Sequence, residues 1–180
     1  MPDIMLDIET LSQHPDAVIL TIGAIKFDPY TLDSFGEPLY VRPDVDSQLE
    51  SGRTYTEETV EWWGKQPDDV REEALGTDGR ISVEETYRSL NRYLVGVNNI
   101  WTQGPVFDIC IMENLYRQHG WPIPWNFWQI SDSRTLFKIH GDPRPKNRAS
   151  LHNALEDCIS QAQAVQRIYN DIGLRPRFSK

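Results

Sequence analysis

Short runs of apolar and β-branched residues, separated by turns, fill the first part of the chain. Residues 3–9 and 17–28 predict two strands, residues 28–31 (Asp-Pro-Tyr-Thr) predict a turn, and residues 34–42 predict a third strand. Because the connections are short, we expect successive strands to pair antiparallel, as a meander.

The middle of the chain changes to helical signals. The spacing of a capping box occurs twice, at Thr54 with Glu57 and at Ser82 with Glu85, and each predicts a helix that begins after the Thr or Ser. Pro67 suits the first turn of a further helix between them. Helices therefore follow the meander.

The second half predicts short strands that alternate with helices. Residues 100–102 and 127–131 predict the strands, and residues 107–119 predict the first helix. The last helix is expected to be capped by Ser150 and to end before Gly173. Its apolar stripe consists of Leu151, Leu155, Cys158, Ile159, Ala162, Val165 and Tyr169. A meander followed by this alternation predicts an α/β fold, in which helices flank a mixed sheet.

Composition places the chain among ordinary globular proteins. Its 180 residues fit a single domain over residues 1–180, and the 39% hydrophobic share is enough for one core. No signal peptide is visible in residues 1–7, and the longest apolar segment, 17–25, is too short to span a bilayer. Cys110 and Cys158 are too few for a disulfide framework, so both are expected to be buried, in a reducing compartment such as the cytoplasm.

The net charge of −9 argues against a protein that grips long nucleic acid by releasing counterions. Two divalent cations held by acidic side chains would offset four of these charges. The segment 134–148 is locally basic, with five cationic residues against Asp142: Arg134, Lys138, Arg144, Lys146 and Arg148. An acidic protein with one basic loop suits brief contact with the end of a strand.

Candidate chemistry begins with an acidic pair at the end of the first strand. Side chains two apart on a strand share a face, so Asp7 and Glu9 could bind one hard cation together. Such pairs are also common on solvated strand ends, and alone this pair favours that explanation. Asp108, at the start of a helix, is equally explained by the helix dipole.

His152 and Asp157 lie at the start of the last predicted helix. Five residues apart, they would point roughly 140° away from each other on a regular helix. We therefore expect His152 to project from the first turn while Asp157 points sideways, into a site beside the helix. A surface histidine and an ordinary acid at the edge of the apolar stripe are the simpler explanation of each residue alone.

Taken together, and in their order along the chain, these five residues favour a functional site over the simpler explanations. The sequence resembles the DEDDh (DnaQ-like, RNase H-like) exonucleases over nearly the whole chain. Three motifs carry the resemblance: Asp7-Ile8-Glu9-Thr10-Leu11 after an apolar strand, Asp108 about a hundred residues later, and His152 with Asp157. The related tyrosine-type family carries Tyr where this chain has Asn153.

Residues 18–25, the Glu61-Trp62-Trp63 segment and the basic loop look like a bacterial and phage subgroup. That subgroup contains a mycobacterial exoribonuclease and phage exodeoxyribonucleases.

The resemblance implies a 3′→5′ exonuclease that releases nucleoside 5′-monophosphates from single-stranded RNA or DNA. Its four acids, Asp7, Glu9, Asp108 and Asp157, would hold two Mg²⁺ or Mn²⁺ ions, with Asp7 as the bridging ligand. Such ions, about 3.5–4 Å apart, stabilise both the attacking and the leaving oxygen. His152 would take the proton from the attacking water, since a free imidazole is partly neutral at physiological pH.

Further residues are candidates for binding the 3′-terminal nucleotide and its phosphates: Thr10, Leu11, Phe107, Trp62, Trp63, Arg144, Lys146 and Arg148. By resemblance the first two contact the terminal sugar or wedge a base, and Phe107 could stack on a base. Adjacent tryptophans on a helix point about 100° apart, so one is expected in the core and the other exposed. A solvated loop explains the three basic residues almost as well as phosphate contact does.

Three other functions stay open. A catalytically silent nucleic-acid-binding module would keep the same fold, but the intact set of five site residues disfavours it. A hydrolase with a histidine-rich metal site is disfavoured because the four histidines lack His-x-x-x-His spacing. The His-x₄-Asp pair points away from a strand-transfer enzyme. The sequence does not decide between RNA and DNA, since that depends on contacts with the 2′-OH. It is also compatible with a homodimer, the state of many relatives.

Overall fold

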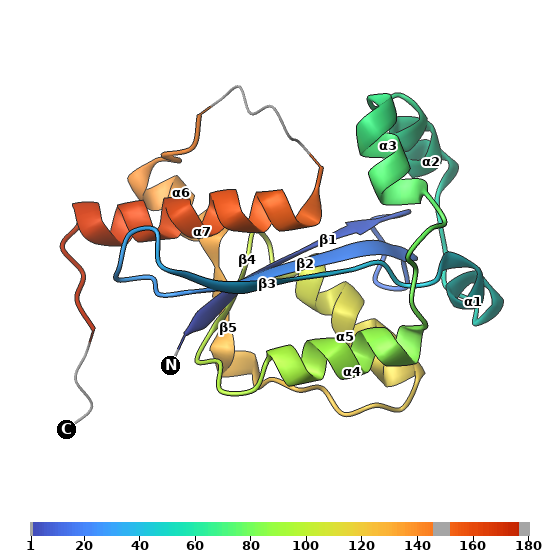
Figure 1. The fold of residues 1–180 in the computed structure, drawn as a ribbon, viewed down its shortest axis with the longest axis horizontal. Coiled ribbons are helices and arrows are strands. Elements are labelled where there is room, and N and C mark those ends of the chain that lie inside the picture. Colours follow the sequence, from blue (N-terminus) through green and yellow to red (C-terminus); the bar gives the residue numbers. More distant parts are fainter. Residues whose placement is uncertain (1, 146–151, 177–180) are drawn as a thin grey trace.

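The computed structural model of the chain describes residues 2–145 and 152–176, and its centre is a five-stranded mixed sheet (Figure 1). The strands are β1 (Asp3–Thr10), β2 (Ile19–Phe27), β3 (Phe35–Val41), β4 (Ile100–Thr102) and β5 (Ile130–Asp132). Their spatial order is β3-β2-β1-β4-β5. The first three pair antiparallel, and β4 and β5 continue the sheet parallel to β1. The expected meander and mixed sheet are confirmed.

Helices cover both faces of this sheet. They are α1 (Val45–Glu50), α2 (Glu57–Gly64), α3 (Asp68–Leu75), α4 (Val83–Tyr93), α5 (Asp108–Gln118), α6 (Ser133–His140) and α7 (Ala154–Asp171). In Figure 1, α6 and α7 lie over one face, α4 and α5 lie under the other, and α2 and α3 stand beyond the carboxyl end of β1. Among the described helices, none combines the length and the apolar character needed to cross a bilayer.

The alternation of β1 divides the core between the two faces. Ile4, Leu6 and Ile8 pack in one cluster with side chains of α4 and α5. Met5 belongs to a second cluster, built with α6 and α7. Because odd-numbered residues of β1 share a face, its acidic side chains lie on the α7 side of the sheet.

Several predicted boundaries were wrong. Thr56, not Thr54, caps α2, since its Oγ1 accepts a hydrogen bond from the Thr59 amide at 3.4 Å. The predicted strand at 127–131 is a 3₁₀ turn, η1 (Phe127–Gln129), followed by β5. The cap at Ser82 is confirmed, its Oγ accepting from the Glu85 amide at 3.1 Å.

The segment before the last helix differs most from the prediction. Residues 133–140 form α6, whereas the whole basic segment had been expected to be a loop. Asn153 caps α7 by accepting from two backbone amides, and the predicted cap Ser150 lies outside the described residues. The same holds for Leu151, the first residue of the predicted stripe. Cys158 is buried as expected, but Cys110 is exposed.

Candidate active site

Three carboxylates meet at the carboxyl end of β1. Asp7 and Glu9 are half-buried on the α7 face, while Ile8 between them is buried in the core on the opposite face. Asp157 reaches them from the first turn of α7. One oxygen from each of the three residues lies within 4.8 Å of the other two, so together they could hold a divalent cation.

A glycine allows α7 to approach the sheet closely enough to form this cluster. Gly23 of β2 lies directly opposite Asp7. A Cβ at Gly23 would lie only 2.4 Å from the carbonyl carbon of Ala154, the first residue of α7. The Cys158 thiol donates a hydrogen bond to the Gly23 carbonyl at 3.2 Å. Backbone contact at Gly23 therefore fixes the turn of α7 that carries Asp157.

The fourth acid, Asp108, is the first residue of α5 and is only 4% exposed. Burial raises the pKa of Asp108 to about 7, against the opposing effect of backbone hydrogen bonds and of the positive charge of Arg134. Its negative charge raises the pKa of Asp7 and Glu9, but Asp108 is not part of the group whose ligand oxygens lie within 4.8 Å of one another.

The carboxylates make one another difficult to ionise. Burial, then the charges of Asp108, Glu9 and Asp157, hold the pKa of Asp7 well above its usual range. Burial, then Asp157 and Asp108, raise the pKa of Glu9 to about 8. Negative charge of this density in a shielded site is costly unless positive charge compensates it.

His152 borders the acidic cluster from just before α7. Its backbone amide donates to Asp157 Oδ2 at 3.2 Å, and its φ of 70° is left-handed. Its ring meets the Trp62 ring edge to face, with 4.6 Å between the centroids. His152 therefore lies outside the helix, and the predicted angle between two side chains of one helix does not apply.

Sequence and structure comparisons identify the chain. A model of the 3′-5′ exoribonuclease Rv2179c-like domain matches residues 2–169. The chain belongs to this family. It is a 3′-5′ exonuclease, as its motifs predicted.

Two individual proteins extend this result. The exonuclease is 28% identical to the exodeoxyribonuclease of Enterobacteria phage T4, over 88% of this chain and 85% of the phage protein. Its structure resembles the nuclease domain of 3′hExo, a DEDDh family member solved with bound rAMP, with a TM-score of 0.62 and 13% identity over 99% of this chain and 96% of that one. The expected RNase H-like fold is confirmed. DEDDh nucleases use divalent metal ions, and the acidic cluster matches that requirement.

The structure separates the two adjacent tryptophans of the exonuclease. Trp63 is 1% exposed, and its Nε1 donates to the Thr10 carbonyl at 3.0 Å, so this side chain is part of the core. Trp62 is 38% exposed and faces His152. Leu11 packs with Trp63 in a small buried cluster, which leaves little of it to wedge a base. One tryptophan is thus buried and the other exposed, as the helical spacing predicted.

The remaining substrate candidates differ in their surroundings. Arg144 has a side chain only 5% exposed, and its guanidinium donates to Asp142 and to Gln103 Oε1 at 2.6 Å, which fits neither a solvated loop nor a free phosphate donor. Thr10 is buried, with its hydroxyl on the Ser12 carbonyl at 2.6 Å. Phe107 packs partly against the main core. Lys146 and Arg148 lie outside the described residues.

Sequence reasoning missed two residues at this site. Arg134 had been counted only as part of a basic segment, yet its charge acts on Asp108 while its Nε donates to the Gln103 carbonyl at 3.1 Å. Gln161 donates from Nε2 to Asp7 Oδ1 at 3.1 Å. The position of Gln161, one helical turn after Asp157, was a signal that could have revealed it.

Proposed function

We propose that this exonuclease removes nucleotides one at a time from the 3′ end of single-stranded RNA or DNA and releases nucleoside 5′-monophosphates. Asp7, Glu9, Asp108 and Asp157 hold two divalent ions, Mg²⁺ or Mn²⁺, and His152 is the general base. The observation that carries the proposal is the crowding of the carboxylates, whose ligand oxygens converge within 4.8 Å for three of them.

The donor set fits hard divalent cations. All four proposed ligands are carboxylates, and oxygen ligands suit Mg²⁺ and Mn²⁺ better than softer metals. The nearby Cys158 is buried and directed to the Gly23 carbonyl, and burial raises the pKa of its thiol, so a thiolate ligand is disfavoured. When bound, two such ions stabilise negative charge on the attacking and leaving oxygens of a phosphodiester. Asp7, the acid acted on by all three others, is proposed to bridge them.

His152 is positioned to serve as the base from outside the carboxylate group. Its backbone is tied to Asp157 and its ring lies against Trp62, so the imidazole is held at the edge of the acidic cluster. We propose that a ring nitrogen accepts the proton of the attacking water and later passes it to solvent. A neighbouring exposed indole offers a face on which a terminal base can stack.

The proposed substrate includes both RNA and DNA. The family is described as exoribonuclease and the phage relative as exodeoxyribonuclease, so each name supports a different substrate. Arg134 supplies positive charge beside Asp108, which suits the phosphate of either strand.

The direct test uses 5′-labelled single-stranded RNA and DNA of one sequence, incubated with the protein and Mn²⁺ or Mg²⁺. A ladder that shortens from the 3′ end supports the proposal and identifies the preferred sugar. Intact substrates with both metals, or a ladder from the 5′ end, would contradict it; the first result would favour a silent binding module. Loss of the ladder in Asp157→Asn excludes a contaminating nuclease.

A further inference from the structure

Gln161 is a buried residue whose side-chain amide contacts Asp7, one of the proposed metal ligands. It lies on α7 four residues after Asp157, so both side chains project from the same face of the helix. Its side chain is inaccessible, with the residue 3% exposed. Nε2 donates to Asp7 Oδ1 at 3.1 Å, across 154 residues of sequence.

The oxygen of this amide is in a different position from its nitrogen. Among the described residues, Oε1 of Gln161 is buried without a hydrogen-bond donor. With a cation bound, Asp7 would be ionised and would only accept hydrogen bonds, so turning the amide over could not satisfy Oε1 at Asp7. Oε1 is therefore fixed beside the carboxylate cluster as a free acceptor. Native proteins rarely leave a buried carbonyl oxygen unpaired, so a partner that the described residues do not supply, such as a water, is expected here.

We propose that Gln161 is a positioning residue for the metal ions, orienting Asp7 through Nε2 and accepting a hydrogen bond through Oε1 from a water of the ions' hydration shell. The inference rests on the proposed function and names a fifth side chain, not a ligand, on which that site depends. Mg²⁺ usually keeps several of its waters when bound to protein, and these waters need acceptors. Replacing a group that orients a metal ligand in this way typically lowers metal affinity about 10- to 100-fold.

A second buried glutamine on the same helix provides a matched control. Gln166 is 2% exposed. Its Oε1 accepts from the Asp33 amide at 3.1 Å, and its Nε2 donates to the carbonyls of Asp28 and Ser34 at 3.0 and 3.2 Å. Both of its polar atoms are thus paired with backbone near the β2–β3 turn, away from the carboxylates. Gln166 has a structural role alone.

The experiment compares Mn²⁺ binding by isothermal titration calorimetry in the full chain and in Gln161→Met and Gln166→Met. Methionine keeps the length of glutamine and removes both hydrogen bonds. We expect the dissociation constant for Mn²⁺ to rise about 10- to 100-fold in Gln161→Met, and to stay within twofold of the original protein in Gln166→Met. The Mn²⁺ concentration for half-maximal nuclease activity should shift in parallel, with much of kcat recovered at saturating metal.

The outcomes separate this inference from the proposed function. If the unaltered protein does not bind Mn²⁺, the proposed function fails. If it binds but a folded Gln161→Met binds equally well, the role of Gln161 is wrong and the metal site stands. Gln161→Asn, which keeps an amide too short to reach Asp7, gives a second test should Gln161→Met not fold. Unchanged affinity in that variant would equally overturn the inference.

Discussion

The face of β1 that lies against α7 carries acidic side chains at both ends. The two ends differ in the groups that surround the carboxylates. At the amino end, Asp3 is 4% exposed and accepts from Asn99 Nδ2 at 3.0 Å and from Trp101 Nε1 at 2.8 Å. At the carboxyl end, Asp7, Glu9 and Asp157 crowd within 4.8 Å, and Gln161 supplies a single amide donor to Asp7.

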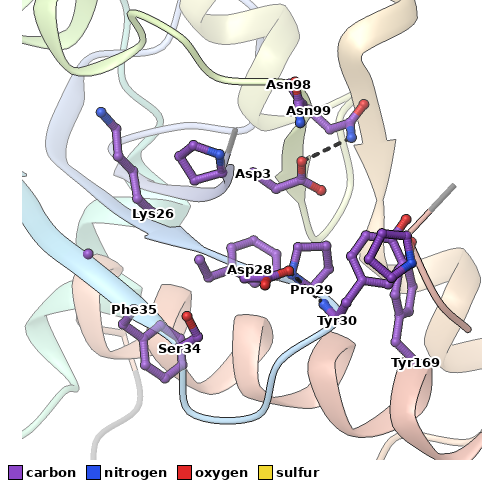
Figure 2. Close-up of a pocket in the computed structure, with 14 residues that line it drawn as sticks. Asp3, Lys26, Asp28, Pro29, Tyr30, Ser34, Phe35, Asn98, Asn99 and Tyr169 are labelled. Carbon is purple, nitrogen blue, oxygen red and sulfur yellow. Dashed lines mark hydrogen bonds between the residues drawn. The ribbon is translucent and has the colours of Figure 1, made fainter. Parts of the chain in front are cut away.

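The environment of Asp3 is that of an ordinary buried polar group. Figure 2 shows it at the wall of an open pocket of about 790 Å³, which Lys26, Asp28 and Tyr169 also line. Burial raises the pKa of Asp3, while the hydrogen bonds from Trp101 and Asn99 oppose that rise. Neutral hydrogen-bond donors of the chain therefore stabilise this buried carboxylate.

At the carboxyl end, Gln161 donates to Asp7 and the His152 amide donates to Asp157, but the carboxylates also face one another. There, the acids raise one another's pKa, that of Glu9 to about 8 and that of Asp108 to about 7. Burial of an acid therefore does not by itself indicate a metal site. What distinguishes the two ends is that the carboxylates of the carboxyl end face one another.

The largest predicted effect comes from the same substitution at the two ends. Asp7→Asn should reduce kcat/KM about 1000-fold or more, because loss of a ligand removes several kcal/mol of transition-state stabilisation. Asp3→Asn should leave activity within a few-fold but lower the stability by about 1–3 kcal/mol, since one buried donor loses its acceptor. Steady-state kinetics and thermal unfolding of both variants measure this. Similar activity losses at both positions would break the comparison.

The next effect isolates the base from the metal ligands. His152→Ala should lower kcat about 100-fold or more, the usual contribution of a general base, while Mn²⁺ still raises the melting temperature as in the unaltered protein. In the unaltered protein the rate should rise with pH through the range in which an imidazole loses its proton. His119→Ala, at the opposite end of α5 from Asp108, is the matched control. Full activity in His152→Ala would refute the role.

The raised pKa values predict how stability depends on pH without metal. Glu9 and Asp108 have folded-state pKa values of about 8 and about 7, above the ordinary values of 4.5 and 3.8. The folded protein thus holds protons that the unfolded chain has released, so stability is greatest below pH 4 for these groups and declines as pH rises to about 8. Thermal unfolding in chelator should show this decline.

Divalent ions should reverse that decline. We expect Mn²⁺ to raise the melting temperature more at pH 8 than at pH 5, because at pH 5 protons compete with the ion for the carboxylates. Glu9→Gln should flatten the decline in the metal-free protein. A melting temperature that is indifferent to millimolar Mn²⁺ at both pH values would count against the cluster as a cation site.

The smallest predicted effect concerns the cations near each end. Arg134→Ala should raise KM roughly five- to tenfold, since the net contribution of one hydrogen bond to a phosphate at an exposed site is about 1 kcal/mol. Lys26 lines the pocket at the Asp3 end, with its Nζ 4.8 Å from the centre of the Tyr93 ring, and Lys26→Ala should leave KM unchanged. KM measured against salt concentration for both variants separates the two ends, and equal effects would remove the distinction.

Local patterns were enough to predict much of the fold and the acidic group. The meander followed from β-branched runs with short connections, and the shared face of Asp7 and Glu9 followed from strand alternation alone. The prediction that Asp108 and Asp157 join that pair came from the resemblance to a family, since no local rule joins residues so far apart; the structure brings an Asp157 oxygen within 4.8 Å of the pair.

What the sequence did not predict depends on tertiary contacts. Helix α6 carries basic residues and a histidine beside a narrow apolar face, so its sequence favoured a loop. In the structure Phe137 of α6 packs in the cluster that α7 builds. Which tryptophan is buried depends on the carbonyl of Thr10, 53 positions away. His152 was placed in a helix because Ser150 looked like the cap, whereas Asn153 caps α7.

The most direct test of the central claim is a calorimetric Mn²⁺ titration of the metal-free protein near pH 7, repeated in two buffers with different ionisation enthalpies. Carboxylates that share protons must release them on binding a cation. We predict saturable binding of two ions per chain, with proton release that disappears in Asp7→Asn and persists in Asp3→Asn. No binding at millimolar Mn²⁺, or binding that survives Asp7→Asn unchanged, would contradict the account.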